Sequence, residues 1–190
     1  MNNEHYQGRA RMNNDVEKVL YTQDQVNQRL DELANTLTEK YQDEFPVLVS
    51  VMTGAMIFTS EMMKRLNFKL NVDYVDVSSY EESSESTGKV KLIQDLSHDI
   101  KGRPVIIMED IIDTGHTLKY LTKLFSDRGA KSIEICSLLD KPDRREVDVE
   151  ANYVGFKVPN EFIVGYGLDF NGLYRNLPFV GILKRSIYEK

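Results

Sequence analysis

Acidic and hydroxyl side chains are concentrated in one short segment that follows an apolar run. The segment Val105–Thr117 opens with four apolar residues, continues with Glu109 and Asp110, and reaches Asp113 after two isoleucines. A turn of small residues follows, beginning at Thr114. Backbone N–H groups in such a turn, at the start of a helix, bind phosphate oxygens. The segment therefore predicts an anion site that also contains carboxylates.

Carboxylates beside a phosphate site need a chemical explanation, because like charges repel. Ribose hydroxyls donate hydrogen bonds to carboxylates, and a Mg²⁺ shared between ligand and protein would offset the repulsion. Both features favour a sugar phosphate over a bare anion, with hydroxyl donors from Thr114 and Thr117. The alternative is a solvated acidic turn after a core strand, and the spacing alone favours neither interpretation.

The surrounding pattern predicts an α/β domain with a largely parallel sheet, because strand-like runs alternate with helix-like runs. A capping box at Thr22–Gln25 starts the first helix. We expect helices over 26–41, 55–66 and 117–128, and strands over 46–53, 72–78, 89–93, 103–108, 132–139, 153–156, 162–166 and 179–183. Ligands of open α/β sheets bind beyond the carboxyl ends of strands, which is where the acidic segment falls.

Composition limits the other classes of function. The 190 residues carry a net charge of -6, with 41% hydrophobic and 28% charged residues. An acidic protein has no electrostatic attraction to nucleic acid or to an anionic membrane, and no stretch has the length of a membrane span. The single cysteine, Cys136, lies in an apolar run and excludes an internal disulfide, so we expect a buried strand residue and a cytoplasmic setting.

Two segments differ from the rest of the chain. Residues 1–11 are polar and lack a hydrophobic period, so we expect a flexible extension, with Met12 as the natural start. Residues 12–190 then form a single domain. Residues 78–88 are rich in Ser, Thr and Glu and lie between two strand-like runs, so we expect a mobile lid loop.

The segment Val105–Thr117 resembles the phosphoribosyl-pyrophosphate binding motif of the type I phosphoribosyltransferases. That motif is a hydrophobic strand, two acidic residues, a short apolar spacer and Asp-Thr-Gly. Further segments resemble the hypoxanthine–guanine branch of that family, especially its bacterial members: Leu138–Pro142, Val154–Phe156, Phe162–Asp169 and Tyr174–Pro178. The resemblance runs from Asp15 to Lys190.

The resemblance implies a fold, a reaction and partners. The fold would be a mostly parallel twisted sheet flanked by helices, with a small hood formed by the terminal segments. The reaction would transfer the 5-phosphoribosyl group from phosphoribosyl pyrophosphate to N9 of hypoxanthine, and of guanine, releasing pyrophosphate. The cofactor would be Mg²⁺, and the enzyme would be a homodimer or homotetramer. Neither nucleic acid nor a membrane would be a partner.

The resemblance also implies roles for single residues in holding the phosphoribosyl group and the purine. Asp113 would be the catalytic base or proton acceptor at purine N7. The ribose and 5′-phosphate would be held by Glu109, Asp110, Asp113, Thr114, Gly115, His116 and Thr117. The purine would contact Lys141, Phe162, Ile163 and Asp169. Within this set, Lys141 would donate to O6 and Phe162 would stack on the ring, whereas His116 is interpreted as a loop residue and not a catalyst.

Pyrophosphate and metal would be bound by a third group of residues. The pyrophosphate ligands would be Thr53, Gly54, Ser79, Tyr80 and Arg175, and the metal ligands would be Glu109, Asp110 and Asp169. The family often has a cis peptide in the Met52–Gly54 loop. Many relatives carry lysine at the position of Thr53, so a side-chain charge there is in doubt, whereas the backbone role is not affected.

The sequence leaves two other classes of function open. One is a regulator of this fold that binds RNA and keeps vestigial catalysis, and the other is a non-catalytic sugar-phosphate binding protein. The net charge of -6 disfavours the first. The lid and the aspartate expected to bind metal disfavour the second.

Overall fold

The computed structural model describes residues 12–79 and 90–189. The predicted extension at 1–11 lies outside the described residues, as does most of the predicted lid at 78–88. Ser78 and Ser79 are the last residues of a strand. The side chains of Ser79 and Tyr80, both predicted to contact pyrophosphate, also fall outside the described part.

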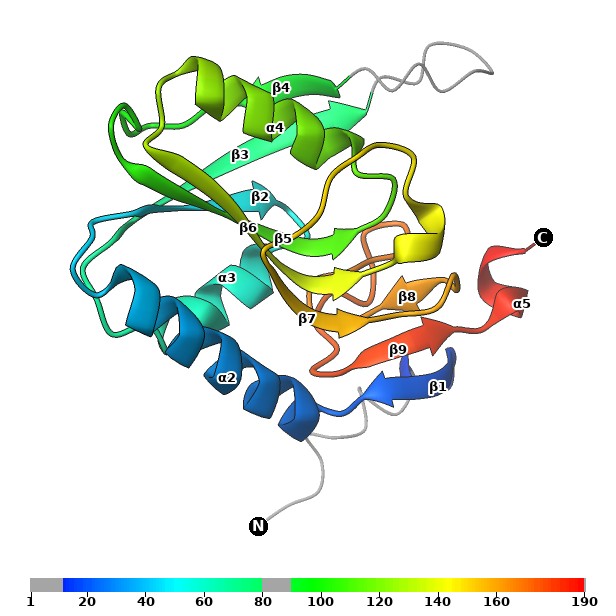
Figure 1. Cartoon of the computed structure of the whole chain (residues 1–190). Coiled ribbons are helices and arrows are strands. Elements are labelled where there is room, and N and C mark those ends of the chain that lie inside the picture. The colour runs from blue at the N-terminus through cyan, green and yellow to red at the C-terminus, as the bar shows by residue number, and fades with distance from the viewer. Residues whose placement is uncertain (1–11, 80–89, 190) are drawn as a thin grey trace.

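A central six-stranded sheet confirms the predicted mostly parallel architecture (Figure 1). Its strands lie in the spatial order β4-β3-β2-β5-β6-β7. Their bounds are Val47–Met52 for β2, Asn71–Ser79 for β3, Val90–Gln94 for β4, Pro104–Ile112 for β5, Ser132–Asp140 for β6 and Tyr153–Lys157 for β7. Every neighbouring pair is parallel except β3 and β4, so the carboxyl ends of five strands share one edge.

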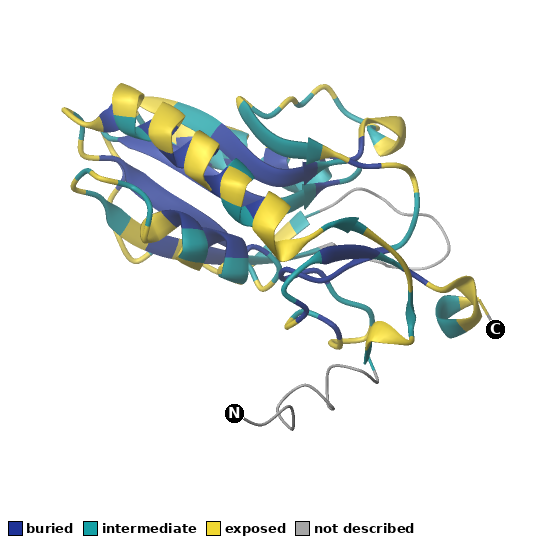
Figure 2. Cartoon of the chain, turned by 90° about the horizontal axis from the view of Figure 1, so that it is seen from below, coloured by how far each residue is buried: buried dark blue, intermediate teal, exposed yellow. Residues whose placement is uncertain are grey.

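Helices cover both faces of this sheet (Figure 1). On one face lie α2 (Gln23–Tyr41) and α3 (Met56–Met63), and on the other lies α4 (His116–Asp127). The capping box at the start of α2 is confirmed, with the Thr22 side chain and the Gln25 side chain each accepting a backbone N–H. The buried residues form one apolar cluster on each side of the sheet, and Figure 2 shows the strands buried between helices with exposed outer faces.

A small second sheet forms the predicted hood from segments near both ends of the chain. It contains β1 (Val16–Tyr21), β9 (Val180–Leu183) and β8 (Ile163–Val164), all antiparallel, followed by α5 (Arg185–Tyr188). The β1 strand was not predicted, because its pairing with β9 rather than an apolar pattern defines it.

The predicted strand over 162–166 was too long. It contracts to β8 because Gly165 and Tyr166 have φ of 94° and 51°, which turn the chain. The short helix η2 (Pro142–Arg144) follows β6 and was likewise not predicted.

The β5 strand is longer than predicted, and this changes where the acidic pair lies. The prediction ended the strand at Met108, but pairing with β6 continues through Glu109 and Ile112. Glu109 and Asp110 therefore belong to the last part of the strand rather than to the loop after it. Cys136 lies in the middle of β6 and is fully buried, as predicted, and burial raises the pKa of its thiol to about 12.

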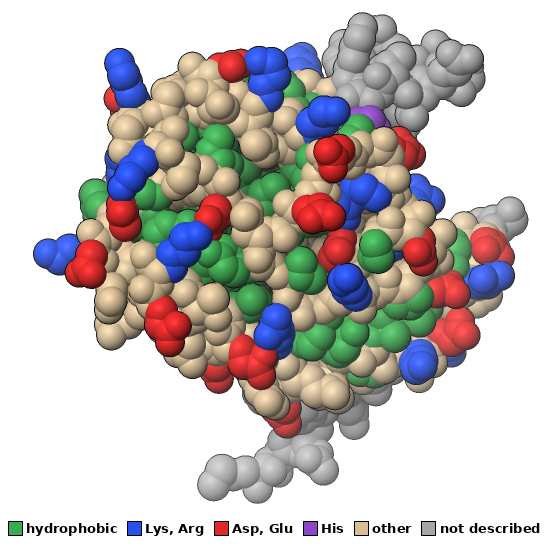
Figure 3. All heavy atoms as spheres, in the orientation of Figure 1, with side chains coloured by type: hydrophobic (Ala, Val, Ile, Leu, Met, Phe, Trp, Pro, Cys, Tyr) green, Lys and Arg blue, Asp and Glu red, His purple; other side chains and the backbone are tan. Residues whose placement is uncertain are grey.

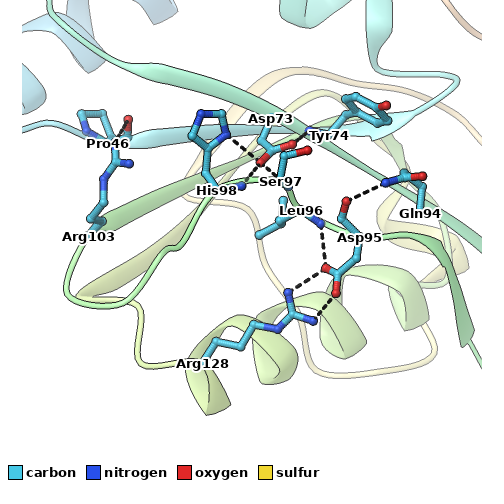
Figure 4. Close-up of polar contacts among 10 residues, drawn as sticks. All are labelled: Pro46, Asp73, Tyr74, Gln94, Asp95, Leu96, Ser97, His98, Arg103 and Arg128. Carbon is cyan, nitrogen blue, oxygen red and sulfur yellow. Dashed lines mark hydrogen bonds and ion pairs between the residues drawn. The ribbon is translucent and has the colours of Figure 1, made fainter.

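Two acidic side chains fix the segment between β4 and β5, one to the sheet and the other to the end of α4 (Figure 4). Buried Asp73 on β3 accepts hydrogen bonds from the backbone N–H groups of Ser97 and His98 at 2.8 and 2.7 Å. Asp95 forms a two-fold ion pair with Arg128 at the end of α4, with both N–O distances 2.7 Å. These contacts lie in the half of the sheet away from the acidic pair.

Positive and negative side chains are interspersed on the face of the molecule that Figure 3 shows, with hydrophobic side chains between them. Across residues 12–79 and 90–189, none of the helices is both long enough and apolar enough to span a bilayer.

Candidate active site

Two adjoining cavities lie at the carboxyl ends of the parallel strands. The larger has a volume of about 530 Å³ and the smaller about 240 Å³. Both are lined by Asp110, Ile111 and Asp113, so the end of β5 forms their shared wall. This is the edge at which open α/β sheets bind ligands.

The smaller cavity contains most of the predicted phosphoribosyl site. It is lined by Glu109, Asp110, Asp113, Thr114, Gly115 and Thr117, together with Met52 and Gly54 from the neighbouring β2 loop. The turn can enter α4 because Gly115 has φ of 90°, a conformation that side chains disfavour. His116 was predicted to be a loop residue, but it is the first residue of α4. It lines neither cavity, and its Nε2 lies 2.8 Å from a carboxylate oxygen of Glu146.

Glu109, which is buried, and Asp110, which is half-buried, form an acidic pair at the end of β5. Burial, followed by the neighbouring charge of Asp110, raises the pKa of Glu109 well above its usual value, and burial also raises the pKa of Asp110. The Asp110 carboxylate lies so close to Gly54 that any β-carbon on Gly54 would overlap it. The β2 loop and the acidic pair therefore fit together only with glycine at position 54.

Asp113 lies between the two cavities and carries an arginine partner that the sequence did not reveal. Nε of Arg144 in η2 donates to Oδ1 of Asp113 at 3.1 Å. Arg144 also lines the larger cavity. The carboxylate of Asp113 is 42% exposed, so it is accessible to a ligand in either cavity.

The larger cavity contains the four residues predicted to bind a purine: Lys141, Phe162, Ile163 and Asp169. Lys141 is buried, and burial lowers the pKa of its ammonium group. Its Nζ donates to the carbonyl of Glu161 at 3.1 Å. A lysine held in this way directs a charged donor into the cavity that it lines.

Phe162 is part of an aromatic cluster. Its ring stacks on Tyr188 of α5 with a centroid distance of 4.9 Å and meets Phe170 edge-on at 5.4 Å. Tyr188 lines the same cavity as Phe162, so a planar ligand would meet an aromatic wall there.

Asp169 and Arg175 pair with each other. Their N–O distance is 2.7 Å, and Arg175 also donates to the carbonyl of Gly167 at 2.6 Å. Arg175 and Thr53 line neither of the two cavities, although Gly54 packs closely against Gly167. The peptide bond between Met52 and Thr53 is cis, as the resemblance implied.

Several residues that line the cavities were not predicted, and for most of them the sequence carries a weak signal. Arg144 comes three residues after Lys141, close to the end of β6, and this position could have identified it as a cavity residue. Leu168 immediately precedes Asp169 in a segment that was already singled out. Tyr188 has no local signal, because the docking of α5 against Phe162 is a tertiary contact.

The donor set fits a magnesium ion. Magnesium takes oxygen ligands, commonly one or two carboxylates together with substrate phosphates. Glu109 and Asp110 supply carboxylates to the smaller cavity, and Asp169 supplies one to the larger. A divalent cation would also favour the ionised forms of the buried pair. Among the described residues, no three or more His, Cys, Asp or Glu gather into a metal cluster.

Comparison with known proteins gives consistent matches over nearly the whole chain. The family model of the phosphoribosyl transferase domain matches residues 18–171. The hypoxanthine-guanine phosphoribosyltransferase of Bacillus subtilis is 48% identical over 178 residues, which are 94% of this chain and 99% of that protein. The crystal structure of a hypoxanthine phosphoribosyltransferase from Staphylococcus aureus superimposes with a TM-score of 0.91 at 47% identity, covering 94% of this chain and 97% of that one.

A more distant structure shows the same fold. The hypoxanthine phosphoribosyl transferase of Trypanosoma cruzi, in a structure concerned with the role of its C-terminal region in oligomeric state and activity, has a TM-score of 0.86 at 36% identity. It covers 91% of this chain and 94% of that one. The chain therefore belongs to the phosphoribosyltransferase family.

Proposed function

We propose that this protein is a purine salvage enzyme that transfers the 5-phosphoribosyl group from phosphoribosyl pyrophosphate to N9 of hypoxanthine, and of guanine. The products are the purine nucleoside 5′-monophosphate and pyrophosphate. The relatives named hypoxanthine-guanine phosphoribosyltransferase support this activity. The single buried cysteine fits a reducing compartment, and we infer that the enzyme acts in the cytoplasm.

The phosphoribosyl group occupies the smaller cavity. The turn from Asp113 to Thr117 binds the 5′-phosphate through backbone N–H groups and the two threonine hydroxyls, at the start of α4. The acidic pair Glu109 and Asp110 accepts hydrogen bonds from the ribose hydroxyls. This places C1 of the ribose toward the shared wall formed by the end of β5.

The purine occupies the larger cavity, with its ring against the aromatic cluster of Phe162. Lys141 donates to the O6 carbonyl, which selects a 6-oxopurine because a 6-amino group presents a donor at the same place. The backbone at Ile163 reads the ring edge. A cavity of about 530 Å³ accommodates a bicyclic base.

Bond exchange takes place at the shared wall. The bond from ribose C1 to pyrophosphate breaks as N9 of the base attacks C1, and Asp113 accepts the proton that the base carries at N7. The Arg144 hydrogen bond fixes the orientation of the Asp113 carboxylate during this step. Much of the rate enhancement then comes from positioning and electrostatics.

The leaving pyrophosphate is held by the β2 loop and by Arg175. Gly54 supplies a backbone N–H, and Arg175 exchanges its bond to Asp169 for the pyrophosphate oxygens. We also propose that Ser79, Tyr80 and the loop to residue 88 shield the reacting centre from water. Mg²⁺, held either by Glu109 and Asp110 or by Asp169, with substrate oxygens completing its ligands, would stabilise the charge of the departing group.

The proposal rests above all on the shared wall, because Asp113, the predicted proton acceptor, lines both the smaller and the larger cavity. Incubation with phosphoribosyl pyrophosphate, hypoxanthine and Mg²⁺ should give nucleotide and pyrophosphate in equal amounts, and a chelator should abolish both. Pyrophosphate release that is independent of the base would instead indicate hydrolysis, and an absence of both products would contradict the proposal.

We further propose that the enzyme is a homo-oligomer, a homodimer or homotetramer. Val72 and Tyr74 on β3 and Ile93 on β4 are 38, 47 and 55% exposed and apolar, and we call them the β3/β4 patch. Val72 and Tyr74 lie on the face of the sheet where α2 and α3 pack. Because α3 packs against β2 and β5, the side chains of Val72 and Tyr74 stay exposed. A second copy of the chain would bury this patch.

Sedimentation of the purified protein tests this assembly. The unaltered chain should sediment as a dimer or larger, and Tyr74→Lys should shift the population toward the monomer. A monomer at micromolar concentration for the unaltered chain would contradict the proposal. An unchanged oligomer for Tyr74→Lys would place the interface elsewhere.

A further inference from the structure

The turn of residues 113–117, which we call the phosphate turn, is hydrogen-bonded to a short segment of the loop after β6. Nε of Arg145 donates to the carbonyl of Asp113 at 3.1 Å. The next backbone N–H, that of Glu146, donates to the carbonyl of Thr114 at 3.0 Å. Two consecutive carbonyls of the turn are therefore fixed by two consecutive residues of another segment.

Fixing these carbonyls also fixes the N–H groups of the turn. In a planar trans peptide the C=O and the following N–H point in opposite directions. The bond to the Asp113 carbonyl therefore directs the N–H of Thr114 away from Arg145, and the bond to the Thr114 carbonyl does the same for the N–H of Gly115. Within the described part of the chain neither N–H has a hydrogen-bond partner, and both residues line the smaller cavity.

Arg145 ties the turn to two further segments. Its guanidinium also donates to the carbonyl of Val149, in the loop that leads to β7, and to the carboxylate of Asp140 at the end of β6. The side chain is only 18% exposed. Each of its three nitrogens donates to a different acceptor, whereas a lysine would have to reach all three from a single nitrogen.

The stem of Arg145 packs against the turn as well. A β-carbon on Gly115 would lie 3.0 Å from Cδ of Arg145 and 3.1 Å from a methyl group of Val147. Arg145 itself lines neither the larger nor the smaller cavity. It therefore acts on a ligand through the turn and not by contact.

We propose that Arg145 is a positioning residue for phosphate recognition, holding the Thr114 and Gly115 N–H groups in the orientation that binds the 5′-phosphate. The inference rests on the proposed function, because it assigns the smaller cavity to the phosphoribosyl group. It predicts that loss of the three hydrogen bonds weakens binding of the phosphoribosyl substrate and leaves binding of the purine base unchanged.

The test compares Arg145→Met with Arg29→Met in the full chain with Mg²⁺. Methionine keeps an unbranched stem against Gly115 but donates no hydrogen bond. Arg29 is the matched control, because its Nε and Nη2 hold the carbonyls of Gly155 and Val154 at 2.9 and 2.8 Å, and it lines neither cavity. Both variants lose an arginine that holds backbone carbonyls.

We expect the KM for phosphoribosyl pyrophosphate to rise about tenfold in Arg145→Met, a loss typical of a misaligned donor to a charged group. The KM for hypoxanthine should stay within about twofold of the unaltered enzyme, as should both constants in Arg29→Met. Arg145→Lys, which keeps one donor nitrogen, should recover part of the loss. Equal rises in both KM values, or none in either, would overturn the proposal.

Binding of ribose 5-phosphate, measured by calorimetry, separates this inference from the proposed function. Arg145→Met should weaken its dissociation constant about tenfold, whereas Arg29→Met should not change it. If the unaltered protein binds ribose 5-phosphate but turns over no base, the enzyme proposal fails while the role of Arg145 is still measured. If Arg145→Met does not fold, Arg145→Lys carries the comparison, and unaltered binding in that variant would overturn the proposal.

Discussion

Carboxylates at two places in the same sheet have opposite surroundings. Asp73, on β3, accepts hydrogen bonds from the N–H groups of Tyr74, Ser97 and His98, and one of its oxygens lies 2.9 Å from Nδ1 of His98 (Figure 4). Burial would raise the pKa of Asp73, but these bonds outweigh it and lower the pKa. Glu109 and Asp110 are neighbours at the end of β5. Asp110 accepts one hydrogen bond, from the Ile111 N–H at 2.8 Å, but burial still raises the pKa of both.

The difference separates a structural site from a functional one. Asp73 meets donors supplied by the chain itself, so its charge stabilises the fold. The charges of Glu109 and Asp110 are poorly compensated by the chain, which is the condition expected of groups that meet hydroxyls or a cation from a ligand. Mutations at the two sites should therefore affect different measurements, activity at one and stability at the other.

The largest expected effect is on catalysis at the acidic end of β5. Asp113→Asn should lower kcat by roughly 10²- to 10⁴-fold, because the amide cannot accept the N7 proton. The folded structure and unfolding midpoint should hardly change, since Asp113 is 42% exposed. Asp127→Asn, which removes an exposed carboxylate paired with Lys123 on α4, is the control for activity. Turnover near that of the unaltered enzyme in Asp113→Asn would remove the base role.

Gly54→Ala should have the next largest effect on activity. A β-carbon there overlaps the Asp110 carboxylate, so either the loop or the acidic pair must move, and kcat/KM should fall about 100-fold. Gly102→Ala is the matched glycine, because nothing lies within 4 Å of its β-carbon position. Its φ of 71° costs some stability but should leave activity unchanged. Equal activity in the two variants would show that the acidic pair tolerates displacement.

Asp73→Asn should change stability and not activity. The variant should lose about 2 kcal/mol of unfolding free energy at pH 7, because the N–H donors around Asp73 lose a charged acceptor. The folded pKa of Asp73 is lowered, so its contribution is present above the unfolded pKa of an aspartate and is lost as the pH falls through the folded pKa. Urea titrations of both proteins from pH 7 into the acid range should show the difference shrinking. A constant difference would contradict this assignment.

Glu109→Gln should change the free energy of unfolding by less than Asp73→Asn does, and with the opposite sign. The folded pKa of Glu109 is raised, so its ionised form destabilises the fold, increasingly as pH rises through that pKa. Removing the charge should stabilise the protein by about 1 kcal/mol at pH 7, while weakening phosphoribosyl pyrophosphate binding. The same urea titrations supply the measurement. A loss of stability comparable to that of Asp73→Asn would remove the contrast between the two sites.

Much of the fold could be predicted from local pattern, because the central strands are continuous apolar runs and Thr22 and Gln25 form a recognisable cap. Tertiary pairing decided what was missed. The β1 strand is mostly exposed and is a strand because it pairs with β9. The extension of β5 past Met108 likewise depends on its register with β6, where Glu109 pairs with Ser137.

The residues of the candidate site also divide into those that local sequence could identify and those that depend on tertiary contacts. Residues in contiguous motifs, such as Asp113 and Lys141, could be singled out by resemblance, and the structure brings them to adjoining cavities. Residues that act across the fold could not. Arg145 contacts the phosphate turn from a loop about thirty residues away, and no local pattern distinguishes it from a surface arginine. The pairing of Asp169 with Arg175 also depends on how the intervening turn folds.

Selection of the base in the larger cavity, which Lys141 lines, is the property that the proposed function requires most directly. Steady-state nucleotide formation should be measured with phosphoribosyl pyrophosphate and Mg²⁺, using hypoxanthine, guanine, xanthine and adenine in parallel, in the unaltered protein and in Lys141→Met. We expect turnover of hypoxanthine and guanine with adenine inert, and a loss of kcat/KM for both 6-oxopurines in the variant, because the donor to O6 is gone. Turnover of adenine comparable to that of hypoxanthine, or no turnover of any base by folded protein, would contradict the proposed function.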